Sequence, residues 1–571
     1  MATQYSDEYD VVVAGSGIGG LSAAITAAER GARVLVVEKL DKLGGVTALS
    51  SGVLWPGPNS LSESLGFEDS VEEAQAYMNT ITRGLAKEDL KLGYLARSRE
   101  AIQYFTDKIG VELQVIRGVP DYYHPSVQGS KVEGRFLESK PFSGKRLGMW
   151  TDKVLTSPYG PAFSYVTGTE WAASQTGKAN IVESLQQHVQ EDERCGGAGL
   201  SAALVYAALQ HNVEFRTSTA LADLIVEDGR VVGVLIEPVA SSSGGDGVTN
   251  DTTKGTGNHE KALRLQVRQG VVMAIGGYDW RKDLVQAFDG LKECSTMVPP
   301  TITGDHIVMA SKVGAIPIPA RLPGQSPIFV GYRVPGEVIF GYPSSRLLLA
   351  GAPHSIIVNR KGLRFANDGF YPHVVEQVTR YGSQMTHMPN WPAWLVFDQS
   401  MLDKYGLAPT YPGQPLPEGL AIQADSIKEL AERAGIDSTG LSETVDRYNG
   451  YCETATDPEF GRGTYPWSAI MVGDYRLRNP NMAELARGPF YAVQLVHVSL
   501  GSGTAGLSTD EHGRVLTVLG APIPGLFAAG NSTAWQDWGG GYTSGVAGMR
   551  GMIYGHRAAL HMTSDVSPKL Y

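Results

Sequence analysis

Residues 11–20, which read VVVAGSGIGG, decide the fold of this chain. The first four are an apolar run typical of a buried β-strand, and the glycines after them indicate a tight turn. An Ala-rich helical segment then ends at Gly31, and a second apolar run at 33–37 leads to Glu38. This order of strand, Gly-x-Gly-x-x-Gly turn, helix, strand and acid predicts a β–α–β unit that binds a dinucleotide.

Each glycine of the turn has a physical role in the predicted unit. Gly15 permits the tight turn, Gly17 lets the backbone approach a pyrophosphate, and Gly20 lets the helix pack on the strand. The helix N-terminus directs N–H groups and a partial positive charge toward the phosphates. We expect Glu38 to accept a hydrogen bond from a ribose hydroxyl. The motif alone does not distinguish FAD from NAD.

Composition limits the class of protein. The chain has 571 residues, of which 42% are hydrophobic and 19% charged, so it can bury a large core. Its length is enough for about four average domains, but interrupted nucleotide-binding folds run large and we expect two. The net charge of -11 and the pI near 5.6 indicate no basic stripe for phosphates, so we expect no nucleic-acid partner.

Cysteines and apolar runs bear on metal sites and location. Cys195, Cys294 and Cys452 form no CxxC pair, which argues against a disulfide framework or a zinc site. We therefore expect no metal. The polar, acidic first ten residues do not resemble a secretory signal, and no run approaches 18 apolar residues. We expect a cytoplasmic protein without a transmembrane segment, and peripheral attachment through a hydrophobic patch stays open.

The pattern of the chain changes along its length. Helical spacing of apolar residues is found in 69–110 and 196–211, and a hairpin is expected over 221–237. Residues 241–260 are almost entirely polar, so we expect a mobile surface insertion there. A buried strand at 271–275 then ends in Gly276 and Gly277. From about 300 to 487 short strands alternate with prolines, and helices are expected at 426–434 and 441–453.

Two distant segments carry a resemblance to a known family. Residues 42–56, KLGGVTALSSGVLWP, and 523–531, IPGLFAAGN, resemble the flavin-binding motifs of the fumarate reductase and 3-ketosteroid dehydrogenase superfamily. The resemblance implies non-covalently bound FAD. The residues expected to bind it are Gly15, Ser16, Gly17, Gly20, Glu38, Lys39, Gly44, Gly45, Thr47, Ser50, Ser51, Gly52, Ala220, Leu221, Gly276, Gly277, Gly530 and Asn531.

The resemblance also implies the fold class. We expect an α/β protein with a Rossmann-like FAD-binding domain, interrupted by an α+β substrate domain that carries catalytic residues. The FAD-binding domain would comprise residues 1–300 and 488–571, and the substrate domain residues 301–487.

A segment of the predicted substrate domain separates branches of the superfamily. Residues 358–368, VNRKGLRFAND, resemble its "VN..G.RF.NE" motif. Fumarate reductases place an Arg about five residues past the Asn, whereas this chain has Tyr371 four residues past Asn367. A Tyr there resembles the 3-ketosteroid dehydrogenases, in which it removes the α-proton of a ketone.

A phenol needs help to act as this base. Its ordinary pKa is about 10, so half ionisation at pH 7 requires a fall of about three units, or about 4 kcal/mol. A second tyrosine that donates a hydrogen bond would share this load. By resemblance to the family's loop tyrosine, the candidates are Tyr123, which we prefer, and Tyr122.

A third part of the expected site follows the second flavin motif. Residues 537–545 read DWGGGYTSG, and Tyr542 with Gly545 resembles the oxyanion hole of steroid Δ1-dehydrogenases if one residue is deleted from the turn. Each such donor can contribute about 3 to 4 kcal/mol in the transition state. Ser544, two residues after Tyr542, also resembles the Δ4-(5α)-dehydrogenase variant. The position of desaturation therefore stays open.

Other tempting residues have simpler explanations. Arg550 lies in the helical segment after the turn, where a structural ion pair is expected rather than an anion clamp. His497 lies in an apolar run, which favours a core histidine over a covalent flavin link. The aromatic-rich region 325–345 could line an apolar pocket or belong to the core.

The prediction is an FAD-dependent α,β-dehydrogenase of a cyclic ketone, similar to 3-ketosteroid dehydrogenases. By this resemblance Tyr371 takes the α-proton, Tyr542 and the Gly545 amide polarise the carbonyl, and flavin N5 accepts the β-hydride. The partners would be a small hydrophobic ketone and an external electron acceptor. A cyclohexanone-type substrate, a fumarate- or urocanate-type reductase and a non-enzymatic flavoprotein are the alternatives.

Overall fold

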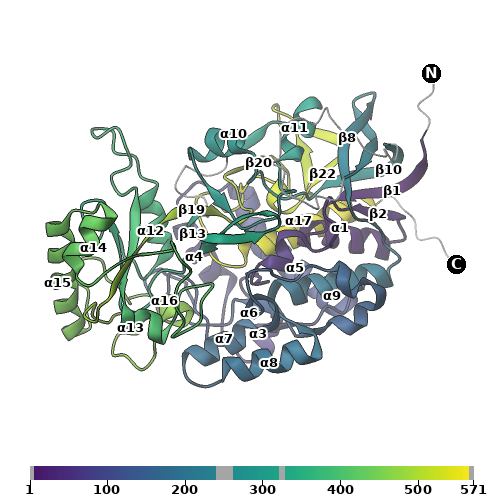
Figure 1. The fold of residues 1–571 in the computed structure, drawn as a ribbon. Helices are drawn as coiled ribbons and strands as arrows, with labels where there is room; N and C mark the ends of the chain where they lie inside the picture. The colour runs from purple at the N-terminus through teal and green to yellow at the C-terminus, as the bar shows by residue number, and fades with distance from the viewer. Residues whose placement is uncertain (1–4, 240–261, 320–327, 565–571) are drawn as a thin grey trace.

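The computed structural model describes residues 5–239, 262–319 and 328–564. The expected mobile insertion at 241–260 lies outside the described residues. The described chain is an α/β protein in which a large sheet and its covering helices lie beside a second, smaller α+β region (Figure 1). Among the described residues, no helix combines the length and apolar character needed to cross a bilayer.

The main sheet is built on the stretch that opens the chain. Strand β1 pairs in parallel with β2 and β10, and β10 pairs in parallel with β22. Both faces of these strands are covered, which is why their sequences read as continuous apolar runs. The strands in spatial order are β21 (Arg514–Leu516), β22 (Pro522–Ala528), β10 (Leu263–Met273), β1 (Asp7–Ala14), β2 (Val34–Val37) and β7 (Glu214–Arg216).

One face of this sheet is covered by three apolar helices, α1 (Ile18–Glu29), α9 (Gly196–Gln210) and α17 (Val546–Met562). Helix α17 can cross α1 closely because glycines remove the side chains between them. On the other face, the antiparallel hairpin β8 (Thr219–Glu227) and β9 (Arg230–Pro238) packs with α11 (Asp305–Lys312). The expected hairpin over 221–237 and the expected helix at 196–211 are both confirmed.

The N-terminal half also carries a helical layer below the main sheet in Figure 1. The expected helices between 69 and 110 are confirmed as α4, α5 and a short π-helix that continues α5. Helices of this part of the chain include α2 (Gly45–Leu49), α3 (Ser60–Ser64), α4 (Val71–Ile81), α5 (Glu88–Gln103), η1 (Tyr104–Lys108), α6 (Ala162–Tyr165), α7 (Gly168–Gln175) and α8 (Ile181–Glu191).

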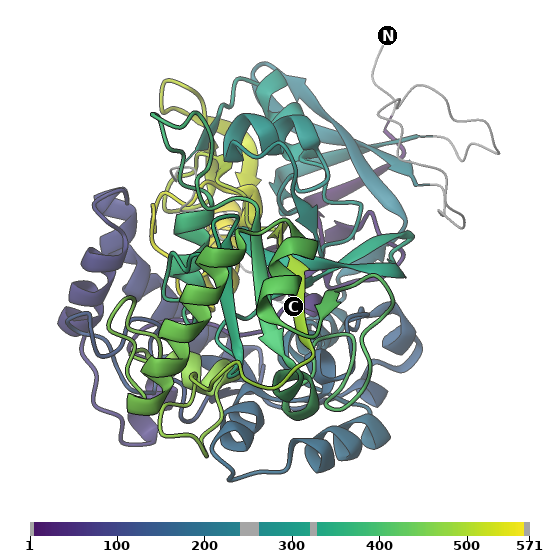
Figure 2. The same ribbon diagram turned by 60° about the vertical axis from the view of Figure 1, so that its left-hand side comes forward.

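A second sheet, wholly antiparallel, lies in the green region that Figure 2 brings forward. One of its faces packs on α14 (Ile427–Ala434) and α15 (Ser438–Thr454), close to the helices expected at 426–434 and 441–453. Its strands in order are β15 (Ser355–Asn359), β16 (Ala393–Asp398), β18 (Phe490–Gln494) and β17 (Ile422–Ala424).

A third sheet lies next to the second sheet along the chain. The sheet of β11 (Ser295–Thr296), β19 (Val496–Ser499), β13 (Ile328–Ile339) and β14 (Tyr342–Leu347) follows the second sheet through β18 and β19. The site described below also uses β6 (Glu193–Arg194), α12 (Tyr371–Val378), α16 (Pro466–Val472) and η4 (Gly530–Ser532). The domain boundaries at 300 and 487 stay a prediction. The place of β18 in the second sheet favours a later second boundary.

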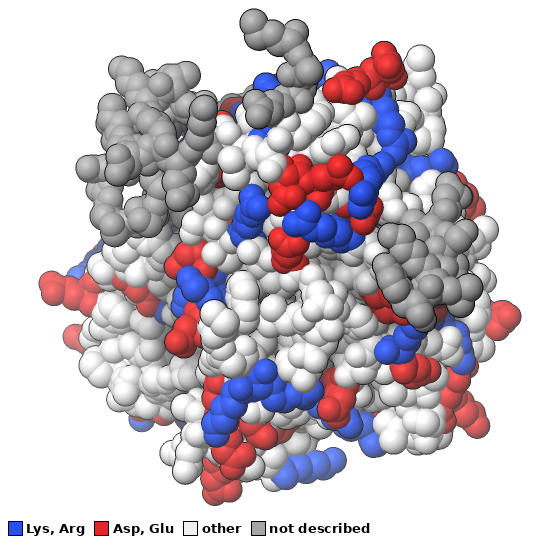
Figure 3. Space-filling view, turned by 90° about the vertical axis from the view of Figure 1, so that its right-hand side faces the viewer, with Lys and Arg blue, Asp and Glu red and all other residues white. Residues whose placement is uncertain are grey.

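Charges are mixed on the surface near the main sheet. On the described part of the face drawn in Figure 3, basic and acidic side chains lie next to one another. At the N-terminal end of the sheet, Arg33 pairs with Asp7 and Glu214, and Arg268 pairs with Glu8 and Asp10. Such pairing leaves no continuous basic stripe on this described face.

The α1–α17 crossing generates a stability prediction. A Cβ atom at Gly555 would lie 2.2 Å from the Gly19 carbonyl oxygen and 3.0 Å from the Ala23 nitrogen. Gly555→Ala should therefore lower the apparent free energy of unfolding by about 1–3 kcal/mol, the usual cost of overpacking. Urea unfolding followed by circular dichroism measures the change.

A matched control lies in α15. A Cβ at Gly450 would meet no atom within 4 Å, so Gly450→Ala should raise stability by about 0.4–1 kcal/mol. If both variants gain stability equally, the crossing is looser than described.

Candidate active site

The glycine turn lies at the carboxyl end of the parallel strands. Gly15 follows β1 with a φ of 98°, and a Cβ atom on it would lie 2.3 Å from the Ala274 carbonyl oxygen. A Cβ on Gly20 would lie 1.9 Å from the Gly15 oxygen. Gly17 occupies the N-cap position of α1 and, as glycine, has no side chain to cap the helix. The turn therefore has the tight backbone and the glycine N-cap that suit a pyrophosphate.

Glu38 braces this turn from the end of β2. Its carboxylate is buried and accepts hydrogen bonds from Ser16 N (2.9 Å), Ser16 Oγ (2.6 Å) and Leu40 N (2.9 Å). Burial raises the pKa of Glu38, and these hydrogen bonds oppose the rise. Both oxygens thus have protein partners, so its expected hydrogen bond to a ribose stays a prediction.

The segment 44–52 crosses the N-terminus of α1. Gly44 N donates to Ser16 Oγ (2.9 Å), and Ile18 N donates to Thr47 Oγ1 (3.0 Å). Farther along, Gly52 N donates to Ser50 Oγ (3.0 Å). The flavin-type motif is therefore fixed against the glycine turn by side-chain hydroxyls. Gly45 begins α2, and Ser51 lies beside the start of α9.

The second flavin-type motif meets the first from the other side. Asn531 follows β22, and its Nδ2 donates to Ser502 Oγ (3.3 Å). Ser532 Oγ donates to the Gly276 oxygen (3.1 Å), which joins this motif to the end of β10 beside Gly277. Asn531 Oδ1 is buried without a hydrogen-bond partner among the described residues, and a Cβ at Gly530 would meet no atom within 4 Å. An orphaned acceptor beside open space fits a bound FAD.

Other expected cofactor residues have partners that bear on their role. Lys39 Nζ donates to Thr303 Oγ1 and Asp305 Oδ2, both at 2.9 Å, so its charge is paired within the protein. Leu221 is buried in the core on the hairpin face of the sheet, next to Ala220. The Thr219 N–H, one residue earlier, donates to the main-chain carbonyl oxygen of Glu38 (2.9 Å). The expected contact of Ala220 and Leu221 with FAD stays a prediction.

A cluster of tyrosines lies where the second region meets the main sheet. Tyr371 begins α12, and its hydroxyl donates to the Tyr122 hydroxyl at 3.2 Å. Both rings are buried. The Tyr542 ring lies 6.2 Å from the Tyr122 ring, and the Ser544 hydroxyl interacts with Tyr122. The structure thus brings together residues from three segments that the sequence singled out.

The electrostatics of Tyr371 differ from the expectation. Burial raises its pKa well above the usual value, and the neighbouring Tyr122, Tyr542 and Tyr123 add to the rise. Because Tyr371 donates its proton to Tyr122, that hydrogen bond also raises the pKa of Tyr371. The expectation that a second tyrosine would lower the pKa is therefore not met in this geometry.

The hydroxyl that contacts Tyr371 belongs to Tyr122 rather than to the preferred Tyr123. The Tyr123 ring packs against Phe370 (centroids 5.4 Å apart), Tyr465 (6.3 Å) and Tyr77 (6.5 Å). Adjacent residues of a loop point in different directions, and sequence alone gave no periodicity to choose between them.

The Gly-rich turn with Tyr542 packs on the segment after the first flavin motif. Gly545 has a φ of 84° and precedes α17, and its carbonyl accepts from Trp55 N (3.3 Å). A Cβ on Gly545 would lie 2.7 Å from the Leu54 carbonyl carbon. Only glycine fits both the backbone angle and this contact.

Two aromatic residues complete the cluster. Phe329 lies 4.9 Å from the Tyr371 ring, and Trp467 of α16 lies 4.3 Å from the Tyr122 ring. The aromatic-rich region 325–345 was expected to line a pocket or to belong to the core. Phe329 lies in the tyrosine cluster, whereas the Tyr332 ring belongs to a different hydrophobic core. Trp467 carried no motif and could not be found from sequence.

The Tyr122 loop is fixed by a buried carboxylate. Asp121 accepts from Trp55 Nε1, Arg135 Nη1 and Lys131 N, each at 2.9 Å. Arg135 is itself buried and donates two more hydrogen bonds to Asp69, both at 2.7 Å. The residue before Tyr122 is thus held from two sides.

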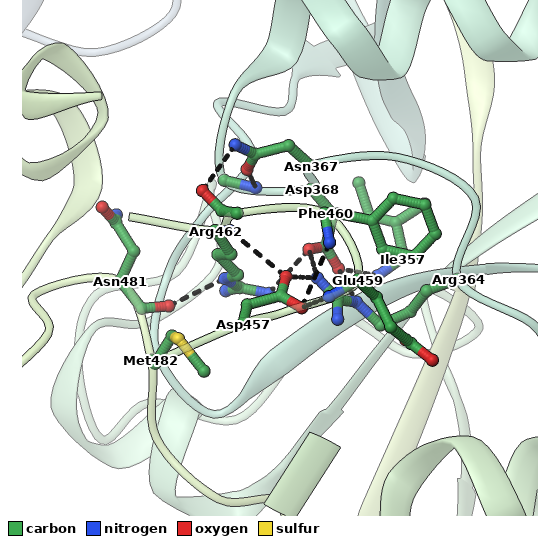
Figure 4. Close-up of polar contacts among 12 residues, drawn as sticks. Ile357, Arg364, Asn367, Asp368, Asp457, Glu459, Phe460, Arg462, Asn481 and Met482 are labelled. Carbon is green, nitrogen blue, oxygen red and sulfur yellow. Dashed lines mark hydrogen bonds and ion pairs between the residues drawn. The ribbon is translucent and has the colours of Figure 1, made fainter. Parts of the chain in front are cut away.

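The Tyr371 loop is fixed by two buried Arg and two buried Asp side chains, which point toward one another in Figure 4. Arg364 Nη2 donates to Asp368 Oδ1 and Asp457 Oδ2, both at 2.7 Å. Arg462 Nη1 lies 3.2 Å from Asp368 Oδ1. We call Arg364, Asp368, Asp457 and Arg462 the four-charge network. It is electrically neutral, and its charges hold the pKa of Asp368 and Asp457 below the usual value against the effect of burial.

Arg462 also reaches three backbone oxygens. It donates to Asn481 O (2.8 Å), Ser355 O (2.7 Å) and Ala352 O (2.8 Å). Its side chain packs beside Gly369, two residues before Tyr371. Arg462 therefore links the segment just before α12 to three other residues of the chain.

Arg550, His497 and the three cysteines lie outside the tyrosine cluster. The expected structural role of Arg550 fits its contacts, because Nε donates to Asp537 Oδ1 (2.6 Å) and Nη2 to Ala534 O (2.7 Å). His497 is buried and stacks on Trp391 (3.8 Å), and burial lowers its pKa to about 4. The three cysteines form no disulfide in the described chain.

The four-charge network generates a second prediction. Arg462→Met should lower stability by about 3–5 kcal/mol, because it leaves a buried carboxylate with an incomplete set of partners. Arg433→Met is the control, since its pair with Glu429 is exposed and should contribute about 0–1 kcal/mol. Thermal unfolding of the two variants measures the contrast, and equal losses would contradict the role given to Arg462.

The sequence matches a known family and several characterised enzymes. Residues 10–547 match the family model described as an FAD binding domain. The chain is 32% identical to a 3-oxosteroid 1-dehydrogenase of Mycolicibacterium smegmatis, over 98% of each chain. It is also 32% identical to a 4-oxocyclohexanecarboxylate 2-dehydrogenase of Sinomonas cyclohexanicum, over 92% of this chain and 88% of the relative.

A solved structure agrees in fold over the whole chain. The 3-ketosteroid delta1-dehydrogenase of Sterolibacterium denitrificans, in complex with 1,4-androstadiene-3,17-dione, superposes with a TM-score of 0.86 and 28% identity. The comparison covers 98% of this chain and 100% of that structure. The chain therefore belongs to the FAD-binding family that includes the 3-oxosteroid 1-dehydrogenases.

Proposed function

We propose that this protein is an FAD-dependent dehydrogenase that introduces a double bond next to the carbonyl of a 3-oxosteroid. The contact between the Tyr371 and Tyr122 hydroxyls, with Tyr542 beside them, carries the proposal. The names of the relatives support a 3-oxosteroid as substrate and the 1-position as the site of desaturation. When FAD is bound, its ring supplies the acceptor for the hydride.

In the proposed mechanism Tyr371 removes the α-proton. Its phenolate forms when Tyr371 loses its proton to hydroxide from solvent, and the Tyr122 hydroxyl, 3.2 Å away, can then turn to donate its own hydrogen bond to that phenolate. The pKa of Tyr122 is raised mainly by burial, and its contacts with Tyr371 and Ser544 lower it. Ser544 therefore acts on the pair through Tyr122, which supports a positioning role.

Tyr542 and Gly545 would hold the carbonyl oxygen. They lie in the turn before α17, and Gly545 is fixed against the segment 54–55. Donors placed where the enolate charge develops stabilise the transition state more than the ground state. Phe329 and Trp467 are both buried and pack on Tyr371 and Tyr122, so we expect them to limit the access of water to this pair.

A second candidate substrate is a cyclohexanone carboxylate. The S. cyclohexanicum relative has the same 32% identity to this chain as the mycobacterial one, over a smaller share of both chains. The electron acceptor and the cytoplasmic location stay predictions.

The base assignment is tested by flavin bleaching. Under anaerobic conditions androst-4-ene-3,17-dione should reduce the bound flavin, and Tyr371→Phe should slow this by at least about 100-fold, the lower range for acid–base catalysis. FAD should stay bound, because Tyr371 makes no contact with the glycine turn. Tyr381→Phe, at a tyrosine 58% exposed, is the control. Unchanged bleaching in Tyr371→Phe would show that another group is the base.

The pH dependence has a definite sign. Because burial raises the pKa of Tyr371, its phenol holds its proton at neutral pH. The bleaching rate should therefore rise as pH increases from about 7 to about 10, toward the ordinary range of a phenol. A rate that falls over this range would mean that a protonated group limits the reaction.

Substrate size is decided by the same assay with two ketones. The steroid should bleach the flavin at lower concentration than 4-oxocyclohexanecarboxylate, because only the steroid buries four apolar rings. The reverse order of bleaching efficiency would assign the protein to the smaller substrate.

A further inference from the structure

Three side chains with metal-binding atoms meet away from the tyrosine cluster. Glu170 belongs to α7, His188 to α8, and Cys195 immediately precedes α9. One ligand atom from each, a carboxylate oxygen, an imidazole nitrogen and the thiol sulfur, lie within 4.8 Å of one another. Cys195 and His188 are buried, and Glu170 is partly exposed.

The two nitrogens of His188 both face carboxylates. Nε2 lies 3.0 Å from Glu170 Oε1, and Nδ1 lies 2.9 Å from Glu193 Oε2. A neutral imidazole carries one N–H, so it can donate to only one of these oxygens. The other nitrogen then directs a lone pair at a carboxylate. A second proton or a cation must lie between them.

The surroundings of His188 are those of a metal ligand. Metal-binding histidines usually donate their other ring N–H to a carboxylate, which is the place of Glu193 here. Glu170 Oε2 is already engaged, because it accepts from Thr167 N (2.9 Å) and Thr167 Oγ1 (2.8 Å). This capping box holds the carboxylate in place and leaves Oε1 for a cation.

The ligand set selects the metal. Thiolate, imidazole and carboxylate together suit Zn²⁺, whereas Mg²⁺ and Ca²⁺ prefer oxygen alone. The 3.0 Å separation of Glu170 Oε1 and His188 Nε2 is close to the edge of a zinc tetrahedron, about 3.3 Å for ligand distances near 2.0 Å. Because Glu170 is partly exposed, we expect water to supply the fourth ligand.

We propose that Glu170, His188 and Cys195 bind one Zn²⁺ ion, with Glu193 orienting the imidazole. The metal would tie α7 and α8 to the start of α9. That start packs on the flavin-binding segment, since a Cβ at Gly197 would lie 2.0 Å from the Thr47 oxygen. The ligands are spread over residues 170–195 without a CxxC pair, so the cysteine pattern of the chain could not reveal them.

Zinc titration of the intact protein tests this site. The tag-free, FAD-loaded full chain is stripped with EDTA, gel-filtered and titrated with ZnCl₂ in a calorimeter. We expect one equivalent to bind. Glu193→Gln should weaken binding by about 10–100-fold, the usual effect of losing a partner of a metal-binding histidine. Cys195→Ser and His188→Gln should weaken it at least as much, and Cys452→Ser should not change it.

Binding of Co²⁺ gives an absorption band that depends on a bond between the metal and the Cys195 thiolate, so a purely structural role of Cys195 would not produce it. With CoCl₂ the wild type should show a thiolate-to-cobalt charge-transfer band in the difference spectrum, and Cys195→Ser should lose it while keeping bound FAD. If Cys195→Ser fails to fold, Glu193→Gln carries the test by calorimetry. Absence of stoichiometric binding in the wild type would mean that a second proton on His188 fills the gap and would overturn the proposal. A band that persists without Cys195 would overturn it as well. Neither result depends on ketone oxidation.

Discussion

The structure depends on a steric constraint at the glycine turn, where backbone must lie against backbone. Gly15 touches the chain after β10, Gly20 touches Gly15, and Gly555 touches the first turn of α1. At each of these places a single added carbon would fall within about the distance of a covalent or hydrogen bond to a main-chain oxygen. Because these contacts come from the start, middle and end of the chain, they bring both flavin-type motifs to one edge of the sheet.

The tyrosine cluster is assembled in a different way. Its members come from loops and helix starts at 122, 371, 467 and 542, and no shared strand aligns them. Buried charged side chains hold the loops that carry these residues in place. Asp121 with Arg135 fixes one loop, and the four-charge network fixes the other. Charged groups deep in a core cost free energy unless they are paired and hydrogen-bonded, so they tolerate little displacement from their partners.

The fold was largely predictable because it rests on local patterns. Apolar runs and helical spacing marked β1, β2, α9 and the β8–β9 hairpin, and the glycines of 15–20 marked the turn. Tyr371 was found by its distance from Asn367. The choice between Tyr122 and Tyr123, and the presence of Trp467, could not be predicted. Both depend on side-chain direction and on contacts between segments far apart in sequence. The raised pKa of Tyr371 also depends on tertiary burial, which no motif encodes.

The four-charge network has a consequence for how this protein can diverge. Any single replacement that removes a charge leaves an odd charge in the interior, whereas removal of one acid together with one base keeps the sum at zero. Variation at these sites should therefore be concerted, arriving in compensated pairs or not at all. The loop that carries Tyr371 would then keep its shape, while residues around the tyrosine cluster could change and allow substrates with other rings.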